Sequence, residues 1–174
     1  MLRDRTGLSP ARILAAPSAD LLEVARKGIL PAERVERLRA IASLALEPGG
    51  DLDDVVRRPP KAAMKALRRF PSIGAPGAEK ILLFARRLPV LALESNGLRV
   101  LLRIGFGEEG TGYSAAYRSA QTAASRELPE DCGVRIEAHL LLRRHGQEVC
   151  RRGAPLCDRC PVTASCAYFR ARGR

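Results

Sequence analysis

KAAMKALRRFPSIGAPGAEKILLFARRL, residues 61–88, contains two helix-forming segments joined by a short turn rich in proline and glycine. Ala63, Leu67 and Phe70 recur at helical spacing, which predicts a first helix over Lys61–Phe70 with one buried face. The turn reads Phe70-Pro71-Ser72-Ile73-Gly74-Ala75-Pro76-Gly77, and a second helix is predicted over Ala78–Leu88. The stretch therefore predicts two helices linked by a tight hairpin.

Such a hairpin can bind a phosphate group. Backbone N–H groups at the start of the second helix would face outward without partners, and the helix dipole favours an anion there. Pro71 and Pro76 have no N–H. The predicted donors and contacts are Ser72, Ile73, Gly74, Ala75 and Gly77, followed by the cation Lys80. An ordinary turn between two helices is the alternative, and the strongly basic first helix favours the phosphate site.

The rest of the chain is also predicted to be helical. Apolar periodicity and capping residues indicate further helices at Ser18–Lys27, Pro31–Leu46, Gly97–Ile104, Tyr113–Leu128 and Pro129–Val149. Ser95 or Asn96 is the predicted cap of the helix at Gly97–Ile104. Val90–Leu93 is the only strand-like run, and four residues are too few to define a sheet. The prediction is an all-α protein without a membrane-spanning segment, located in the cytoplasm, or on the nucleoid if the source is prokaryotic.

The charge of the chain is strongly positive and unevenly distributed. Thirty Lys and Arg face nineteen Asp and Glu among 174 residues, a net charge of +11. Residues 57–87 carry nine basic residues and one acid, and residues 143–174 carry eight basic residues and two acids. Two basic zones on a near-neutral remainder indicate a polyanionic partner, most often nucleic acid, whereas solvated helix faces are the alternative.

Four of the five cysteines lie close together near the C-terminus. Cys150, Cys157, Cys160 and Cys166 are separated by six, two and five residues, and Arg151, Arg152 and Arg159 surround them. Without a secretion signal, this pattern indicates metal binding rather than disulfides. Four thiolates can hold either zinc or an iron–sulfur cluster, and the chemistry of the ligands alone does not distinguish the two. Cys132 is interpreted as a bystander thiol.

The order of these motifs resembles the helix-hairpin-helix DNA glycosylases of the endonuclease III superfamily, in the branch with a [4Fe–4S] loop. The matching parts are the hairpin Phe70–Gly74, the segment Leu93–Val100, His145-Gly146 and the cysteine spacing of six, two and five. The resemblance implies a helical barrel lobe, 1–128, with the helix-hairpin-helix at 61–88. It also implies a cluster lobe, 129–174, in which Cys150, Cys157, Cys160 and Cys166 hold a [4Fe–4S] cluster. Double-stranded DNA is the implied partner, with a base flipped into the cleft.

Three departures from the family pattern bear on activity. The family's catalytic Asp aligns with Glu94. The resemblance implies that this carboxylate is catalytic, and Glu places it one bond further from the backbone than Asp would. The family's first hairpin glycine is replaced by Ser72. Pro76 occupies the position of the Lys that forms a Schiff base in bifunctional members, and proline offers no amine. Members of the family also begin with an additional helical segment. Without that segment, the remaining helices would expose apolar surface that it should cover.

The leading hypothesis is a monomeric, monofunctional DNA glycosylase without lyase activity, acting in base-excision repair with Glu94 as its catalytic carboxylate. Arg151, Arg152 and Arg159 would contact phosphates beside the hairpin. A non-catalytic DNA-binding protein of the same fold is the second hypothesis. A four-cysteine zinc module unrelated to glycosylases is the third, and visible absorbance distinguishes an iron–sulfur cluster from zinc.

Overall fold

Helices are the only regular secondary structure in residues 1–173, the part of the chain that the computed structural model describes. No strand is present in this range, so the prediction of an all-α fold is confirmed. The chain divides into two units, Met1–Ala78 and Glu79–Arg174. The division predicted from the sequence, into 1–128 and 129–174, stays a prediction.

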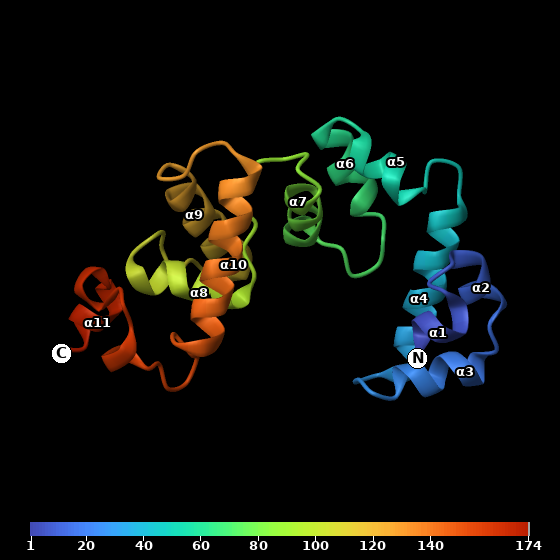
Figure 1. Ribbon diagram of the computed structural model, residues 1–174, viewed down its shortest axis with the longest axis horizontal. Coiled ribbons are helices and arrows are strands. Elements are labelled where there is room, and N and C mark those ends of the chain that lie inside the picture. Colours follow the sequence, from blue (N-terminus) through green and yellow to red (C-terminus); the bar gives the residue numbers. More distant parts are fainter. Residues whose placement is uncertain (174) are drawn as a thin grey trace. The chain divides into compact units, whose positions relative to one another are not determined.

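The first unit is built around one long helix. Its helices are α1 (Leu2–Thr6), α2 (Pro10–Ala15), α3 (Ser18–Ala25), α4 (Pro31–Leu46), α5 (Leu52–Arg57) and α6 (Pro60–Leu67). Helix α4 packs against α2 and α3, and α5 packs against α6 (Figure 1). Leu21, Ala25 and Val35 form the buried contact between α3 and α4. The phosphate-binding hairpin predicted after α6 is thus carried by a unit with its own apolar packing.

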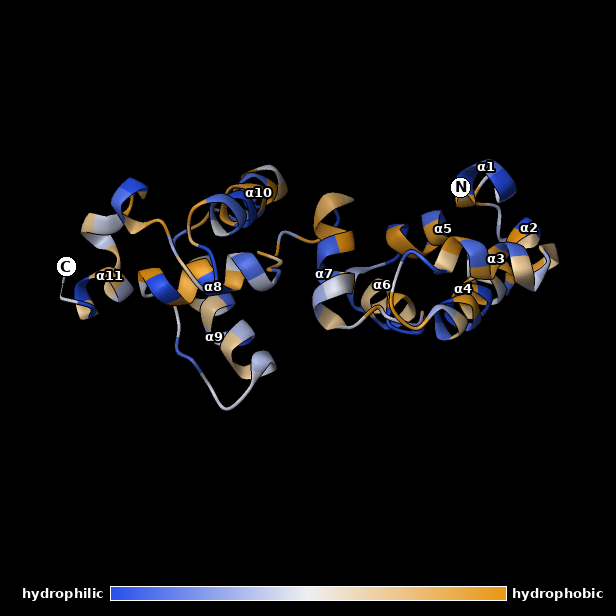
Figure 2. Ribbon diagram, turned by 90° about the horizontal axis from the view of Figure 1, so that it is seen from below, coloured by the Kyte–Doolittle hydropathy of each residue, from blue (hydrophilic) through white to orange (hydrophobic). Residues whose placement is uncertain are grey.

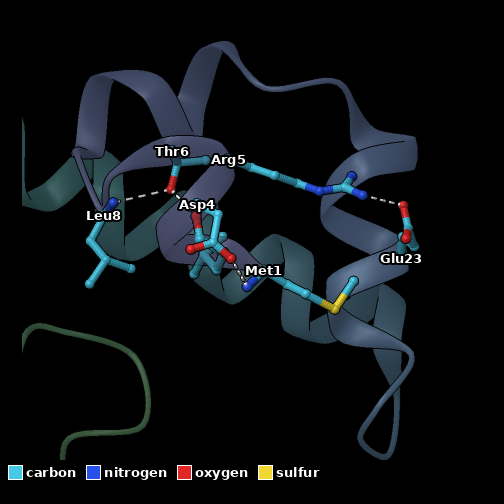
Figure 3. Close-up of polar contacts among 7 residues, drawn as sticks. Met1, Asp4, Arg5, Thr6, Leu8 and Glu23 are labelled. Atoms are coloured by element: carbon cyan, nitrogen blue, oxygen red, sulfur yellow. Dashed lines mark hydrogen bonds and ion pairs between the residues drawn. The ribbon is translucent and has the colours of Figure 1, made fainter.

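Polar contacts attach α1 to the first unit (Figure 3). The Arg5 guanidinium donates to the Glu23 carboxylate of α3 at 2.6 Å. The Thr6 hydroxyl is buried, donates to the Leu2 carbonyl at 2.8 Å and accepts from the Leu8 N–H at 3.3 Å. Both Thr6 hydrogen bonds are local and close the end of α1, so Arg5 supplies the polar contact with α3, and an exposed ion pair of this kind contributes little to stability.

The second unit contains most of the apolar core. It includes the end of α7 (Ala75–Phe84), then α8 (Ser95–Ile104), α9 (Tyr113–Ser125), α10 (Cys132–Glu148), two 3-10 turns at Cys157–Arg159 and Thr163–Ser165, and α11 (Ala167–Ala171). Helix α8 contacts α9, α10 and α11, and it lies side by side with α10 in Figure 1. The buried core comprises Leu91, Leu93, Leu98, Leu101, Tyr117, Ala120 and Ala124.

Helix α8 owes its central position to its amphipathic sequence. Leu98, Val100 and Leu101 are buried, whereas Arg99 and Arg103 remain partly exposed. Hydrophobic and hydrophilic residues both colour this helix in Figure 2. Across residues 1–173, no helix combines the length and the apolar character that a bilayer crossing requires.

Several helix boundaries differ from those predicted. Helix α7 begins at Ala75, three residues before the predicted start, because proline in the first helical turn loses no intrahelical hydrogen bond. Helix α10 begins at Cys132, after the Asp131 side chain caps it by accepting from the Val134 N–H. The prediction that Ser95 or Asn96 caps α8 is wrong: Glu94 caps it, and Ser95 is its first residue.

Candidate active site and DNA-binding elements

Glu94 lies at the junction between an extended segment and the start of α8. Its backbone is extended, with φ −121° and ψ 173°. One carboxylate oxygen accepts from the Gly97 N–H at 2.7 Å, and the other accepts from the Asn96 side-chain amide at 2.9 Å. The side chain is therefore a helix cap, and both of its oxygens have defined positions.

These contacts favour the ionised form of Glu94. Partial burial by itself would raise the pKa of the carboxyl group. Hydrogen bonds from Asn96 and from the Gly97 N–H, together with the charge of His139, outweigh burial and lower the pKa below its ordinary value. Glu94 is consequently a carboxylate at neutral pH.

The Glu94 carboxylate lines a cleft of about 640 Å³ within the second unit. The other lining residues are Lys80, Ile81 and Phe84 of α7 and His139, Leu140, Arg143 and Gln147 of α10. Apolar side chains thus flank one carboxylate and two cations. A cleft of this size is in the range of small-molecule binding sites.

Sequence reasoning missed the α10 side of this cleft. His139, Arg143 and Gln147 are spaced four residues apart and so share one helical face. His139 is buried, with Nδ1 2.6 Å from the Ala92 carbonyl oxygen and its ring edge-on to Phe84 at 5.3 Å between centroids. The four-residue spacing of polar residues along α10 was the available signal.

Tyr113, at the first position of α9, was also missed. It is half exposed, and its ring lies 6.0 Å from that of Tyr117. Partial burial and the negative charge of Glu94 raise the pKa of Tyr113, so its hydroxyl stays protonated. Tyr113 is therefore an accessible aromatic side chain whose pKa responds to the charge of Glu94.

Hydrogen bonds connect the start of α8 with the cysteine loop. The Arg99 guanidinium donates to the Asn96 side-chain oxygen at 2.8 Å, and Asn96 in turn donates to Glu94. Arg99 also donates to the carbonyls of Gly146 at 2.7 Å and Cys150 at 3.0 Å. A Cβ atom at Gly146 would lie 2.8 Å from the Asn96 backbone, so only glycine permits this approach of α10 to α8.

The four clustered cysteines surround one small cavity. Cys150, Cys157, Cys160 and Cys166 all line a space of about 20 Å³. The Arg103 guanidinium lies 3.3 Å from the Cys150 sulfur, and the His145 Nε2 lies 3.6 Å from the Cys160 sulfur. Within residues 1–173, no group of three or more ligating side chains forms a ready-made metal site. Even so, four soft thiols around one cavity, beside a cation, are a donor set that fits an iron–sulfur cluster.

The hairpin has the connection that the sequence predicts but one fewer donor. The Ile73 N–H donates to the Phe70 carbonyl at 3.1 Å, so the prediction that this N–H is free is wrong. The Gly74 carbonyl accepts from the Ala78 N–H at 3.0 Å, which closes the first turn of α7. Among the residues described, no backbone acceptor is assigned to the N–H groups of Gly74, Ala75 and Gly77.

Ser72 adopts a backbone conformation that usually requires glycine. Its φ is +70°, in the left-handed region. Adopting this region costs a non-glycine residue about 1–2 kcal/mol. Ser72 therefore leaves strain in the turn.

The predicted phosphate contacts of the C-terminal region are accessible. Arg151, Arg152 and Arg159 are exposed. Arg103 of α8 donates to the backbone carbonyls of Arg151 and Arg152 at 2.8 and 3.1 Å, which fixes the loop that carries them. Lys80 is exposed on α7, one turn after Pro76.

Comparison with known proteins agrees with this architecture. Models of known protein families give no match to the chain. Endonuclease III of Thermotoga maritima is 23% identical over 167 residues, covering 95% of this chain and 71% of that protein. A solved structure of a non-covalent endonuclease III–DNA complex superposes with a TM-score of 0.78 at 18% identity, covering 99% of this chain and 74% of the other. A thermostable thymine-DNA glycosylase gives 0.74 at 19% identity, covering 98% and 73%.

The chain therefore has the all-α fold of endonuclease III. The resemblance to helix-hairpin-helix DNA glycosylases of the endonuclease III superfamily, first noted from the hairpin and the cysteine spacing, is confirmed by the sequence relatives, and the solved structures agree in fold.

Proposed function

We propose that this protein is a DNA glycosylase that hydrolyses the N-glycosidic bond of a damaged or mismatched base in double-stranded DNA. The observation that carries the proposal is Glu94, an ionised carboxylate fixed by two hydrogen bonds in a cleft of about 640 Å³. The sequence and fold relatives with glycosylase or endonuclease III names support the same class of reaction.

The chemistry needs a fixed carboxylate beside the sugar. As the base departs with the electrons of the glycosidic bond, positive charge develops on the sugar, and the Glu94 carboxylate stabilises it. A water molecule then forms the new bond to the sugar carbon and passes its proton to the carboxylate. The base must first leave the stacked duplex, and the apolar side chains of Ile81 and Phe84 provide a surface for it in the cleft.

We further propose that the enzyme is monofunctional. A lyase step requires an amine that attacks the sugar carbon, and Pro76 supplies none at the hairpin position where the family carries its lysine. Lys80 lines the cleft. Because it lies one helical turn beyond Pro76, about 6 Å along the axis, it is assigned to phosphate binding rather than to covalent catalysis.

DNA binding would use both basic zones. At the hairpin, the proposed donors are the N–H groups of Gly74, Ala75 and Gly77, with Ser72 at the turn and Lys80 beyond it. Ile73 supports the hairpin through its side chain, which lies against Gly77. Arg151, Arg152 and Arg159 would bind further phosphates, and the protein would act as a monomer.

Cys150, Cys157, Cys160 and Cys166 would hold a [4Fe–4S] cluster. The cluster would cross-link a loop that otherwise has only 3-10 turns and would keep its three exposed arginines in place. Arg103, beside the Cys150 sulfur, would offset part of the negative charge of the four thiolates.

The second candidate is a DNA-binding protein of the same fold without catalysis. One specific observation favours it: both oxygens of Glu94 are already engaged in capping α8, which is a sufficient structural reason for a carboxylate there. The two candidates differ in whether the charge of Glu94 matters for anything beyond the cap.

A single-turnover base-release assay separates them. Cluster-loaded protein is incubated in excess over a panel of duplexes with one damaged or mismatched base each. The proposal expects release on at least one duplex, loss of release with Glu94→Gln, and full release with Glu137→Gln, an exposed carboxylate of α10. Borohydride should trap no covalent complex. Tight binding without release on every duplex would support the second candidate.

A further inference from the structure

The extended segment that precedes Glu94 is held by side chains instead of a neighbouring strand. Leu91 and Leu93 are almost fully buried, so their backbone groups need partners inside the protein. The Gln121 amide donates to the Leu91 carbonyl at 3.0 Å, and His139 Nδ1 lies 2.6 Å from the Ala92 carbonyl oxygen. The Leu93 N–H donates to the Tyr117 hydroxyl at 3.2 Å. Helices α9 and α10 therefore fix the path of the backbone into Glu94.

The direction of the Tyr117 hydroxyl is itself fixed. It donates its single proton to Glu79 Oε2 at 2.7 Å, which leaves a lone pair for the Leu93 N–H. Gln121 donates to the same oxygen of Glu79 at 2.9 Å. Burial and the hydrogen bond to Glu79 raise the pKa of Tyr117, so the hydroxyl remains protonated. One acidic residue of α7 thus orients two side chains of α9.

This network acts one residue away from the carboxylate. Leu93 directly precedes Glu94, so the position of its backbone determines where the Glu94 side chain starts. A displacement of about 1 Å at a reacting group can cost about 100-fold in rate. The proposed reaction and DNA binding do not account for Tyr117, Gln121 or Glu79. A hydroxyl group at Tyr117 is unexpected, since this residue is only 4% exposed and belongs to an apolar core.

We propose that Tyr117, oriented by Glu79, is a positioning residue for Glu94. It acts through the Leu93 backbone and has no direct role in bond breaking. Gln121 assists by holding the Leu91 carbonyl and the same Glu79 carboxylate. The inference rests on the proposed glycosylase function of Glu94.

Tyr117→Phe tests the proposal by removing only the hydroxyl. The aromatic ring remains to fill the core, and Tyr168→Phe in α11 serves as the matched control. The single-turnover rate constant of base release at saturating enzyme should fall about 10–100-fold. Affinity for the same duplex should stay within about twofold, because Tyr117 is buried and its hydroxyl is not available to contact DNA.

Combination with Glu94→Gln distinguishes positioning from a purely structural role. If Tyr117 acts through the carboxylate, adding Tyr117→Phe to Glu94→Gln should leave the residual rate unchanged. A merely structural defect would lower the rate by the same factor in both backgrounds. Equal factors would overturn the proposal, as would a wild-type rate in Tyr117→Phe.

Glu79 supplies an independent test if Tyr117→Phe does not fold. Glu79→Gln keeps an oxygen that accepts from Tyr117, whereas Glu79→Ala removes it. The proposal expects Glu79→Ala to lose about 10-fold or more in rate and Glu79→Gln to recover most of that loss. Equal rates in the two variants would contradict it. Absence of base release by the wild-type protein would remove the proposed function together with this inference, whereas Glu94-dependent release with unchanged Tyr117→Phe and Glu79→Ala would remove the inference alone.

Discussion

Two helix N-termini in this protein differ in whether a carboxylate of the chain itself caps them. The N-terminus of α8 is filled by the chain's own carboxylate, since Glu94 accepts from the Gly97 N–H and from the Asn96 side chain. Helix α7 begins at Ala75, directly after Gly74, and within residues 1–173 the N–H groups of Gly74, Ala75 and Gly77 have no assigned backbone acceptor.

The same feature of helix chemistry can therefore serve two purposes. An open N-terminus with small residues can receive an anion from outside, such as a DNA phosphate. A closed N-terminus holds an internal anion at a fixed position and keeps its pKa low, which is the state that the proposed reaction needs. The packing differs accordingly, because side chains of α9 and α10 brace the segment before α8, whereas the hairpin before α7 contains the strained residue Ser72.

Removal of the cysteine site should have the largest effect. Cys157→Ala deletes one of four proposed cluster ligands, so visible iron–sulfur absorbance should disappear and DNA affinity should fall by at least about 100-fold, because the loop carrying Arg151, Arg152 and Arg159 loses its cross-link. Absorbance spectra and DNA titrations at fixed salt measure both. Cys132→Ala, at the one cysteine outside the loop, should change neither. Wild-type binding by colourless Cys157→Ala protein would contradict the structural role of the cluster.

Filling the open N-terminus of α7 should weaken DNA binding. Gly74→Asp places a carboxylate at the cap position, where a Cβ atom has space, with its nearest neighbour 3.8 Å away. Melting temperature should stay the same or rise slightly, since Asp is a good cap, whereas Kd for DNA should rise about 10-fold because the phosphate meets a like charge. The slope of log Kd against log salt should also decrease by about 1.

Gly74→Asn is the matched control for that substitution. It caps the helix without adding charge and should weaken binding clearly less than Gly74→Asp. Equal affinities for the two variants and the wild-type protein would show that the α7 N-terminus does not bind phosphate.

Loosening the closed N-terminus of α8 should shift the pH dependence of base release. Asn96→Ala removes the donor to one Glu94 oxygen, so the lowered pKa of Glu94 should rise towards its ordinary value. The proposed reaction requires the carboxylate, so the acidic limb of the pH–rate profile should move to higher pH.

The stability of the fold should respond with the same sign. A lowered folded-state pKa means that ionised Glu94 stabilises the protein above its unfolded-state pKa, and that this contribution is lost as the pH falls through the folded-state pKa. In Asn96→Ala the folded-state pKa lies closer to the unfolded-state pKa, so the loss in melting experiments should be smaller and should be complete at a higher pH. Ser95→Ala, at the exposed neighbouring position, should move neither curve. An unchanged acidic limb in Asn96→Ala would show that ionisation of Glu94 does not determine that limb.

Relieving the strain in the hairpin should have the smallest effect. Ser72→Gly removes the cost of a left-handed φ but increases the flexibility of the unfolded chain, so the net gain should be at most about 1 kcal/mol, or about 2–4 °C in Tm. Ser72→Ala retains the strain and should not be stabilised. A lower melting temperature for Ser72→Gly than for Ser72→Ala would contradict the assigned strain.

Local sequence patterns predicted the parts of the molecule that depend on short-range chemistry. Helical periodicity identified the helices on either side of the hairpin, and the cysteine spacing together with Leu93–Val100 identified the fold family. The course of the hairpin between α6 and α7 also followed from its prolines and glycines.

The remaining features depend on contacts between residues far apart in the chain. His139 contacts Ala92 at a sequence separation of 47 residues, and Tyr117 contacts Glu79 at a separation of 38. No local sequence pattern predicts contacts over such separations. The cap on α8 was assigned to Ser95 or Asn96 because short polar residues are the usual caps, and the longer Glu94 side chain took that role instead. The Ile73 N–H was counted as free because the i to i−3 bond of the turn is set by the backbone path.

Stability and the rate of base release should be measured on the same preparation of Glu94→Gln, because this substitution separates the charge of Glu94 from its role as a helix cap. Glutamine retains an oxygen that can accept from the Gly97 N–H, so it keeps the cap but removes the charge. The account predicts a melting temperature within about 2 °C of wild type, unchanged DNA affinity and a single-turnover rate of base release reduced at least about 100-fold. A rate close to wild type in this variant would show that Glu94 is only a helix cap and would contradict the account.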